Sequence, residues 1–385
     1  MTNIRPIAMY LPQFHPIPEN DEWWGKGFTE WTNVVKAKPL FKGHYQPQLP
    51  ADLGFYDLRL SEAREAQAEL AKEYGIYGFC YYYYWFNGKR LLEKPIEGVL
   101  ASGKPDFPFM ICWANENWSR RWDGSENEIL IAQNYSREDA VLLAKDLIKY
   151  FRDDRYIKIE GKPFFSIYNP FSIPNLDEYI TTIRKTVYEI EKVDLFFCAF
   201  DTGNKDILTH YQLFDSIIEF QPHSRYLWKY MDDKIKNETN HIIKNTYNHL
   251  LVRFGLKEKI KESYYKAIYR LNYEHYVDYV IKNYIIPTSY DLFPGINPMW
   301  DNTARRGRDA FLFYNNSPQK YGEWLSFILE HYPLKDHENN FLFINAWNEW
   351  AEGNHLEPCE KFGKQYLSET RNQLLLHGSD EGRRL

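Results

Sequence analysis

Two glutamates three positions apart, Glu349 and Glu352, are the residues of this sequence best suited to acid–base chemistry. They lie in the run WNEWAEG at 347–353. If the chain turns helically there, side chains at i and i+3 share one side of the turn, with Cβ atoms about 5–6 Å apart. Two carboxyl groups in an aromatic pocket repel and desolvate each other, which raises one pKa and lets an acid and a base coexist near neutral pH. Cleavage of a glycosidic bond requires such a pair.

The same spacing also occurs on many solvated helices, where it carries no chemistry. Here the pair follows an apolar, strand-like run, alternates with Trp347 and Trp350, and is followed by Gly353. A surface helix is not composed in this way, so we interpret Glu349 and Glu352 as catalytic.

Short apolar runs alternate with longer helical stretches along the chain, which indicates repeated βα units. The eight expected strands span 7–11, 77–83, 109–113, 164–168, 196–200, 216–220, 295–297 and 342–346. The expected helices span 61–74, 91–100, 137–151, 176–190 and 308–331. Eight repeats predict an α/β fold of the (β/α)₈ TIM-barrel type, and such barrels tolerate long insertions.

The chain of 385 residues is expected to form one catalytic barrel domain over 1–376. Residues 12–60 form an unusually long first loop, and a helical insertion is expected at about 225–286, with a helix over 257–284. Residues 377–385 are charged and are expected to form a loose tail.

In a barrel of this type the active site lies at the C-terminal ends of the strands, where the βα loops converge. Polar and aromatic residues at or after the expected strand ends, and Glu30 in the long first loop, are therefore candidates for substrate binding. The candidates are Tyr10, Gln13, His15, Glu30, Tyr84, Trp85, Trp113, Asn115, Glu116, Trp118, Gln221, His223, Trp300, Asp301, Arg305 and Asn348.

Several of these candidates have a second interpretation. The tryptophans among them can stack on sugar rings or simply cap the barrel core. Glu30 can bind a sugar hydroxyl, and Glu116 is a possible third carboxylate of the site. Arg305, with Arg306, either orients the carboxylates or holds an acidic substituent of the substrate.

Composition narrows the classes of partner. The aromatic fraction of 18% suits ligands with both apolar faces and hydroxyl rims, such as oligosaccharides or polysaccharides. The net charge is −6 and no long basic block is present, so nucleic acid is not expected as a partner. We see no signal-like segment and no run of 18 apolar residues, and the four cysteines show no metal-type spacing. A cytoplasmic protein with free thiols and no membrane span is expected.

Motifs for a metal or a cofactor are not found. The histidines lack the close spacing of metal ligands, and neither a Gly-x-Gly-x-x-Gly nor a Walker-type loop is present. The sequence therefore predicts no metal and no cofactor.

The sequence contains several longer motifs: AMYLPQFH at 8–15, WWG at 23–25, FTEW at 28–31, YGF at 77–79, WANENW at 113–118, WDNT at 300–303 and NAWNEWAEG at 345–353. Together these motifs resemble the glycoside hydrolase family 99 enzymes and their WbsX-type relatives from bacterial surface-polysaccharide gene clusters. The resemblance extends from residue 4 to about residue 360, and is weakest around 225–286.

The resemblance implies roles for the glutamate pair. Glu352 corresponds to the general acid/base, and Glu349 to the residue that deprotonates the sugar 2-hydroxyl, which then attacks the anomeric carbon. A 1,2-anhydro sugar intermediate, net retention and an α-linked mannose-type substrate from microbial surface polysaccharide are thereby implied.

One position departs from the glycosidases, which carry His between the two glutamates where this chain has Ala351. Ala is the residue of the WbsX-type relatives, which are commonly labelled glycosyltransferases. We take hydrolysis as the first interpretation. Glycosyl transfer or transglycosylation in O-antigen or capsule biosynthesis stays open, as does a non-catalytic glycan-binding barrel.

Overall fold

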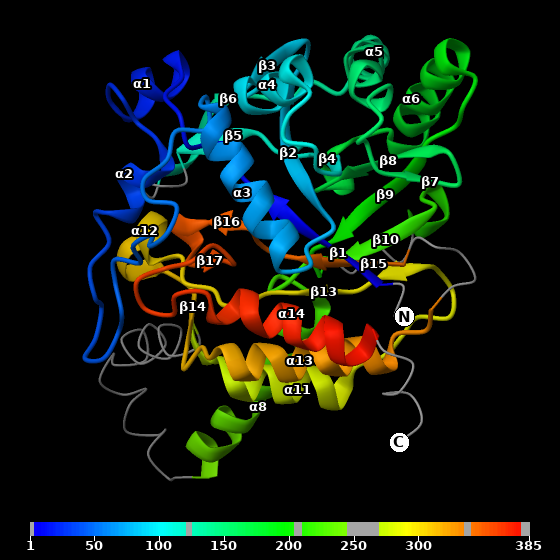
Figure 1. Ribbon diagram of the computed structural model, residues 1–385. Coiled ribbons are helices and arrows are strands. Elements are labelled where there is room, and N and C mark those ends of the chain that lie inside the picture. Colours follow the sequence, from blue (N-terminus) through cyan, green and yellow to red (C-terminus); the bar gives the residue numbers. More distant parts are fainter. Residues whose placement is uncertain (1–3, 121–124, 204–209, 245–268, 335–339, 379–385) are drawn as a thin grey trace.

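A ring of parallel strands forms the centre of the protein. The computed structural model describes residues 4–120, 125–203, 210–244, 269–334 and 340–378. In ring order the strands are β1 (Ile4–Tyr10), β2 (Gly78–Phe86), β4 (Phe109–Trp113), β8 (Lys162–Ile167), β9 (Phe196–Asp201), β10 (Ser216–Glu219), β12 (Leu292–Phe293) with β13 (Gly295–Ile296), and β15 (Asn340–Ile344). Helices surround the ring (Figure 1), which confirms the expected (β/α)₈ barrel.

The ring closes through a strand that Pro294 divides in two. β12 pairs with β10 on one side and β13 pairs with β15 on the other, both in parallel register. A Cβ at Gly295 would lie 1.9 Å from the backbone oxygen of Glu219. Only glycine therefore allows β13 to approach β10 this closely.

Aromatic rings fill the inside of the barrel. The ring of Phe164 on β8 contacts those of Phe293 on β12 and Phe341 and Phe343 on β15, with centroids 5.6–6.0 Å apart. These strands are not neighbours in the ring, so the contacts cross its interior. The interior is thus a packed core, and any cavity must lie beyond the strand ends.

The main helices are α3 (Ser61–Glu73), α4 (Lys94–Ser102), α5 (Arg137–Phe151), α6 (Leu176–Glu191), α8 (Arg225–Lys244), α11 (Tyr273–Asn283), α13 (Pro318–His331) and α14 (Gln365–Gly378). Figure 1 shows α11, α13 and α14 side by side beneath the barrel. Short elements in the loops are α1 (Pro18–Trp24), α2 (Glu30–Val34), β3 (Lys89–Leu91), β5 (Trp118–Arg120), β6 (Ser125–Ile131), β7 (Lys158–Ile159), η2 (Pro170–Ser172) and η3 (Tyr211–Leu213).

The helix expected over 308–331 is wrong over 308–317. It begins at Pro318, where the Ser317 side chain accepts a hydrogen bond from the Lys320 backbone and proline occupies the first turn. The preceding residues form the 3₁₀ turn η4 (Gly307–Asp309) and strand β14 (Leu312–Tyr314). β14 pairs with β11 (Arg270–Asn272).

The inserted segment contains α8, β11 and α11 in its described part. The helix expected over 257–284 is wrong at Arg270–Asn272, which form β11, and residues 245–268 lie outside the described residues. α14 runs through Gly378 and so includes the first two residues of the tail expected at 377–385, whose other residues lie outside the described part of the chain. Among the described residues, no helix has the length and apolarity needed to span a membrane.

Candidate active site

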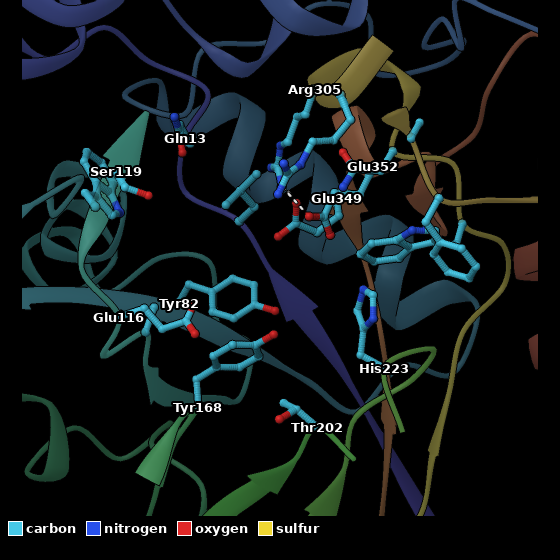
Figure 2. Close-up of a pocket in the computed structure, with 18 of the residues that line it drawn as sticks. Gln13, Tyr82, Glu116, Ser119, Tyr168, Thr202, His223, Arg305, Glu349 and Glu352 are labelled. Carbon is cyan, nitrogen blue, oxygen red and sulfur yellow. Dashed lines mark hydrogen bonds and ion pairs between the residues drawn. The ribbon is translucent and has the colours of Figure 1, made fainter. Parts of the chain in front are cut away.

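A cavity of about 960 Å³ opens at the C-terminal ends of the barrel strands. Residues that follow β1, β4, β8, β9, β10 and β15 line it, together with the second half of β2. Its volume is at the upper end of small-molecule sites, which span about 300–1,000 Å³. Figure 2 shows Glu349 and Glu352 at its centre, with Tyr82, Tyr168 and Glu116 on one side and His223 on the other.

A tight turn presents Glu349 and Glu352, here called the acid pair, to this cavity. β16 (Asn348–Glu349) pairs antiparallel with β17 (Asn354–His355), and the 3₁₀ turn η5 (Trp350–Glu352) connects them. Residues i and i+3 eclipse each other in a 3₁₀ turn, so both carboxyl groups lie on one side, as the spacing predicts.

Gly353 ends this turn in a conformation that other residues rarely adopt. Its φ is +53°, and a Cβ there would lie 2.7 Å from Nε2 of Gln48 and 2.8 Å from Cβ of Asp301. Backbone conformation and space therefore both require glycine next to Glu352.

One guanidinium group binds three carboxylates. Arg305, in α12 (Thr303–Arg306), donates to Oε1 of Glu352 at 2.5 Å, to Oε2 of Glu349 at 3.0 Å and to Oε1 of Glu30 at 2.7 Å. Glu30 is fully buried. Arg305 thus holds the acid pair together and is itself held from behind by Glu30.

In each carboxyl group of the acid pair, one oxygen is not bonded to Arg305. Oε1 of Glu349 and Oε2 of Glu352 make no hydrogen bond to any described residue, and both side chains line the cavity. These two oxygens are positioned to exchange protons with a ligand.

Burial raises the pKa of Glu349, and the nearby charge of Glu352 raises it further, while Arg305 opposes the rise. Burial also raises the pKa values of Glu352 and of Glu30. Three carboxyl groups gather around the guanidinium group of Arg305, so full ionisation is costly. The site therefore retains a proton at pH values where an exposed glutamate has lost it.

Asp301 supports both the turn and the arginine. Its backbone N–H donates to the backbone oxygen of Glu352 at 2.7 Å. Its carboxylate accepts hydrogen bonds from Gln46, His44 and Thr303, the last of these in the first turn of α12. The Leu40 N–H donates to Nδ1 of His44, so Nε2 carries the proton that His44 donates to Asp301.

A second buried acid, Glu357, lies beneath the turn. Its carboxylate accepts hydrogen bonds from Tyr56 at 2.8 Å, from Gln67 at 2.6 Å and from Trp350 at 2.6 Å. Burial raises its pKa to about 7, and the hydrogen bonds oppose the rise. We call Glu357 and its three donors the clamp, because Trp350 belongs to the turn that carries the acid pair.

Nine of the sequence candidates line the cavity. They are Gln13, Tyr84, Glu116, Trp118, His223, Trp300 and Arg305, with Glu349 and Glu352. Trp118 packs edge-on against Tyr84, and Trp300 packs edge-on against His223. Burial lowers the pKa of His223 to about 4, so its imidazole is neutral at physiological pH. The substrate contacts of these residues stay a prediction.

The structure places the other candidates away from the cavity lining. Glu30 and Asp301 hold Arg305 and the turn, as described above. The Asn348 amide exchanges two hydrogen bonds with the Leu11 backbone, at 2.7 and 3.0 Å, and so joins the turn to the end of β1. The polar groups of these residues thus bind other parts of the protein and hold the acid pair in position.

The remaining buried candidates also bond within the protein. Tyr10 donates to Gln67, Gln221 accepts from Tyr276, and Asn115 bonds the backbone of Asn169. Nδ1 of His15 lies 3.1 Å from the Pro12 oxygen, and burial lowers its pKa to about 4.

Two candidate tryptophans face the outer helices. Trp85 donates to Asp139 of α5 at 2.8 Å, and Trp113 stacks on Tyr179 of α6. Both rings thus pack between the strands and the outer helices and lie away from the cavity lining.

Sequence reasoning missed Tyr82 and Tyr168, which were counted as strand residues. Both line the cavity, with ring centroids 6.5 Å apart, and their hydroxyl groups point toward the acid pair in Figure 2. Strand alternation was the available signal. Tyr82 and Tyr84 face the cavity. The alternate residues face α5, where Tyr83 donates to Asp146 and Trp85 donates to Asp139.

Arg306, which the sequence paired with Arg305, also lines the cavity. Lining residues outside the candidate list include Asn20, Trp24, Asn117, Ser119, Thr202, Trp228, Tyr269, Arg270, Asn302, Arg308, Asp309 and Phe311. Apart from Trp228 on α8, they lie in loops and in short elements such as α1, β5 and β11, whose positions depend on tertiary packing. Across the part of the chain that the structure describes, no group of three or more His, Cys, Asp or Glu side chains is arranged to hold a metal ion.

Comparisons with known proteins match the whole barrel. The family model described as "Glycosyltransferase WbsX" matches residues 6–370. Two relatives, each named "Uncharacterized protein WxcX", from Xanthomonas campestris pv. campestris strains B100 and ATCC 33913, are 36% identical over 373 residues. That alignment covers 96% of this chain and 49% of each relative, so the chain spans about half the length of the curated relatives it matches.

Among solved structures, a GH99 endo-α-mannosidase from Bacteroides thetaiotaomicron in complex with bis-tris-propane is similar, with a TM-score of 0.60 and 12% identity over 98% of both chains. Another structure of a GH99 endo-α-mannosidase from that organism has a TM-score of 0.58 and 13% identity over 99% of both chains. A "glycoside hydrolase-like protein" has a TM-score of 0.54 and 11% identity, over 96% of this chain and 93% of that chain. At these identities the likeness shows the fold.

Proposed function

The chain belongs to the WbsX glycosyltransferase family, and we propose that it is a retaining carbohydrate-active enzyme. The proposed reaction is hydrolysis of α-linked mannose-type glycans of microbial surface polysaccharide, through a 1,2-anhydro sugar. The observation that carries the proposal is the acid pair. Arg305 holds it in the cavity, and one oxygen of each carboxyl group makes no hydrogen bond to a described residue.

In the first step Glu349 takes the proton of the sugar 2-hydroxyl, and the 2-oxygen attacks the anomeric carbon. The bond from that carbon to the glycosidic oxygen breaks, and Glu352 donates a proton to the departing oxygen. The products of this step are the freed chain and a 1,2-anhydro sugar. Raised pKa values support both roles, because they keep a proton in the site and make an ionised Glu349 a stronger base.

In the second step water attacks the anomeric carbon and gives a proton to Glu352. The three-membered ring opens, and the 2-oxygen recovers its proton from Glu349. Two inversions at the anomeric carbon give net retention. Both carboxyl groups return to their starting state, so the cycle requires no further acid or base.

This mechanism restricts the substrate. The 2-oxygen must attack opposite the leaving group, which an axial 2-hydroxyl and an α-linkage allow in a mannose-configured ring. Two similar solved structures are GH99 endo-α-mannosidases, which supports an α-linked mannose substrate. Aromatic faces at Trp118 and Trp300 suit the apolar faces of sugar rings.

Glycosyl transfer is the second candidate, because the matching family is described as a glycosyltransferase family. The same acid pair would serve, with an acceptor hydroxyl replacing water in the second step. The Ala351 position, where the glycosidases carry His, also fits this alternative.

The test uses wild type and Glu352→Gln with α-linked mannose oligosaccharides, with a nucleotide-sugar donor and acceptor assayed in parallel. Release of sugar by wild type alone, with retained anomeric configuration by NMR, is the expected result. Extension of the acceptor without hydrolysis would assign the protein as a transferase. Equal behaviour of the two proteins in every assay, with unchanged glycan affinity, would overturn catalysis and leave a glycan-binding barrel.

A further inference from the structure

Arginines from three short elements line one side of the cavity. Arg306 ends α12, Arg308 lies in η4, and Arg270 begins β11. These elements are adjacent because β11 pairs with β14, with Arg270 opposite Leu312, and η4 ends shortly before β14. Arg308 is exposed and Arg270 is half-buried. We call these three residues the arginine rim.

The arginine rim differs from Arg305 in its surroundings. Arg305 binds three carboxylates. Within the described residues, Arg308 makes no ion pair, and the contact of Arg270 is with the face of the Phe41 ring at 4.7 Å. Asp309 is the acidic residue that lines the cavity beside the rim. Arg308 and Arg270 therefore add positive charge to this side of the cavity, and neither forms an ion pair within the described residues.

Another part of the lining is uncharged. Gln13 and Asn20 are buried there, and Nε2 of Gln13 and both amide atoms of Asn20 have no hydrogen-bond partner among the described residues. Trp24 and Trp118 line the same cavity. Amides and indole rings suit neutral sugar hydroxyl groups and ring faces. The cavity therefore offers two kinds of environment to one ligand.

We propose that the arginine rim binds an anionic group of the substrate. Guanidinium groups pair with carboxylate and phosphate oxygens through two parallel hydrogen bonds. The group is the carboxylate of an acidic sugar or the diphosphate of an activated sugar donor. Trp300 and Phe311 line the cavity next to α12 and β14, so a ring of the same ligand has a face to stack on. This inference rests on the proposed function, because it assigns a subsite in the same cavity.

The experiment is a titration of the protein's tryptophan fluorescence at low and high ionic strength. The probes are a mannuronic acid trisaccharide, neutral mannotriose and inorganic pyrophosphate. Wild type is expected to bind at least one anionic probe about tenfold more tightly than mannotriose at low salt, and to lose this preference at high salt. Tighter binding of the trisaccharide identifies an acidic glycan, and tighter binding of pyrophosphate identifies an activated donor.

Arg308→Gln and Arg270→Gln are the test variants, made singly because each is near the surface. Each is expected to weaken the preferred anion severalfold and to leave mannotriose binding unchanged. Arg371→Gln, at an exposed position on α14 outside the cavity lining, is the control and should bind all probes as wild type does. Unchanged anion binding in both test variants, or no preference for either anion in wild type, would overturn the inference.

Turnover is measured separately, so the two proposals can fail independently. Anion preference without turnover on any glycan would overturn the proposed function and leave the arginine rim as a binding site. Turnover on neutral glycans without anion preference would overturn this inference alone.

Discussion

The acid pair and the clamp place buried glutamates within a few residues of each other, yet in different surroundings. Arg305 binds both Glu349 and Glu352, and each keeps an oxygen toward the cavity. Glu357 accepts three hydrogen bonds from uncharged donors and lies away from the cavity. Burial raises the pKa in both places. A raised pKa therefore does not by itself identify a reactive acid, and an accessible oxygen distinguishes the two.

The largest expected effect is on turnover in the acid pair. Glu352→Gln and Glu349→Gln should each lower kcat by about 10²–10⁴-fold, because general acid–base groups contribute on this scale. Both replacements keep the size of the side chain, so circular dichroism and the unfolding midpoint should remain close to wild type. Wild-type turnover in either variant would remove that glutamate from the mechanism.

Arg305→Met should cost about 3–5 kcal/mol of unfolding free energy at pH 7, because it leaves buried carboxylates without their cation. Denaturant unfolding measures this cost, with the exposed Arg371→Met as a control expected within about 0.5 kcal/mol of wild type.

The cost of Arg305→Met should shrink toward pH 5. With folded pKa values raised above the unfolded value, the folded state binds more protons than the unfolded state between the two values. Stability therefore falls as pH rises through that window. The fall is steeper in Arg305→Met, because Arg305 lowers these pKa values and its removal raises them further. A cost that is equal at pH 5 and pH 7 would contradict the shared-charge account.

In the clamp, Glu357→Gln should act on stability more than on chemistry. The new amide NH₂ would face hydrogen-bond donors, which leaves buried groups unpaired at a cost of about 1–3 kcal/mol. Turnover per folded molecule should fall far less than in Glu352→Gln. Comparison of active-site-titrated kcat with the unfolding free energy separates the effects, and a loss of turnover matching that of Glu352→Gln would erase the distinction between the two regions.

Gly353→Ala should give a smaller loss of unfolding free energy. Comparison with Gly363→Ala isolates the part of this loss that comes from crowding. Both glycines have φ of +53°, but a Cβ at Gly363 has no neighbour within 4 Å. Both variants carry the cost of the backbone conformation, and Gly353→Ala should lose roughly 1–2 kcal/mol more through crowding. It should also lower kcat by displacing Glu352. Equal unfolding free energies for the two variants would show that the turn has room to adjust.

Local patterns predicted the barrel well because buried parallel strands form continuous apolar runs with clear boundaries. The strand expected at 109–113 matches β4, and the helix expected at 137–151 matches α5. β11 and β14 were missed because each has three residues and depends on the other for its hydrogen bonds. Ser317 as an N-cap residue and Pro318 in the first turn were sequence signals for the start of α13.

The acid pair could be found from sequence because its spacing, its tryptophans and Gly353 are all local. The roles of Glu30, Asp301 and Asn348 could not, because their partners Arg305, Glu352 and Leu11 lie far away in the chain. A polar residue after a strand can face the ligand or the framework behind it. Only tertiary contacts decide between these orientations.

The most direct test of the central claim compares two α-linked substrates that differ only at the 2-hydroxyl. The wild-type protein is given a mannose oligosaccharide and its 2-deoxy counterpart, and NMR follows product formation and anomeric configuration. The account predicts turnover with retention for the first substrate and no detectable turnover for the second, because Glu349 then has no hydroxyl group to activate. Comparable turnover of both substrates would contradict the 1,2-anhydro route and the role of Glu349 within it.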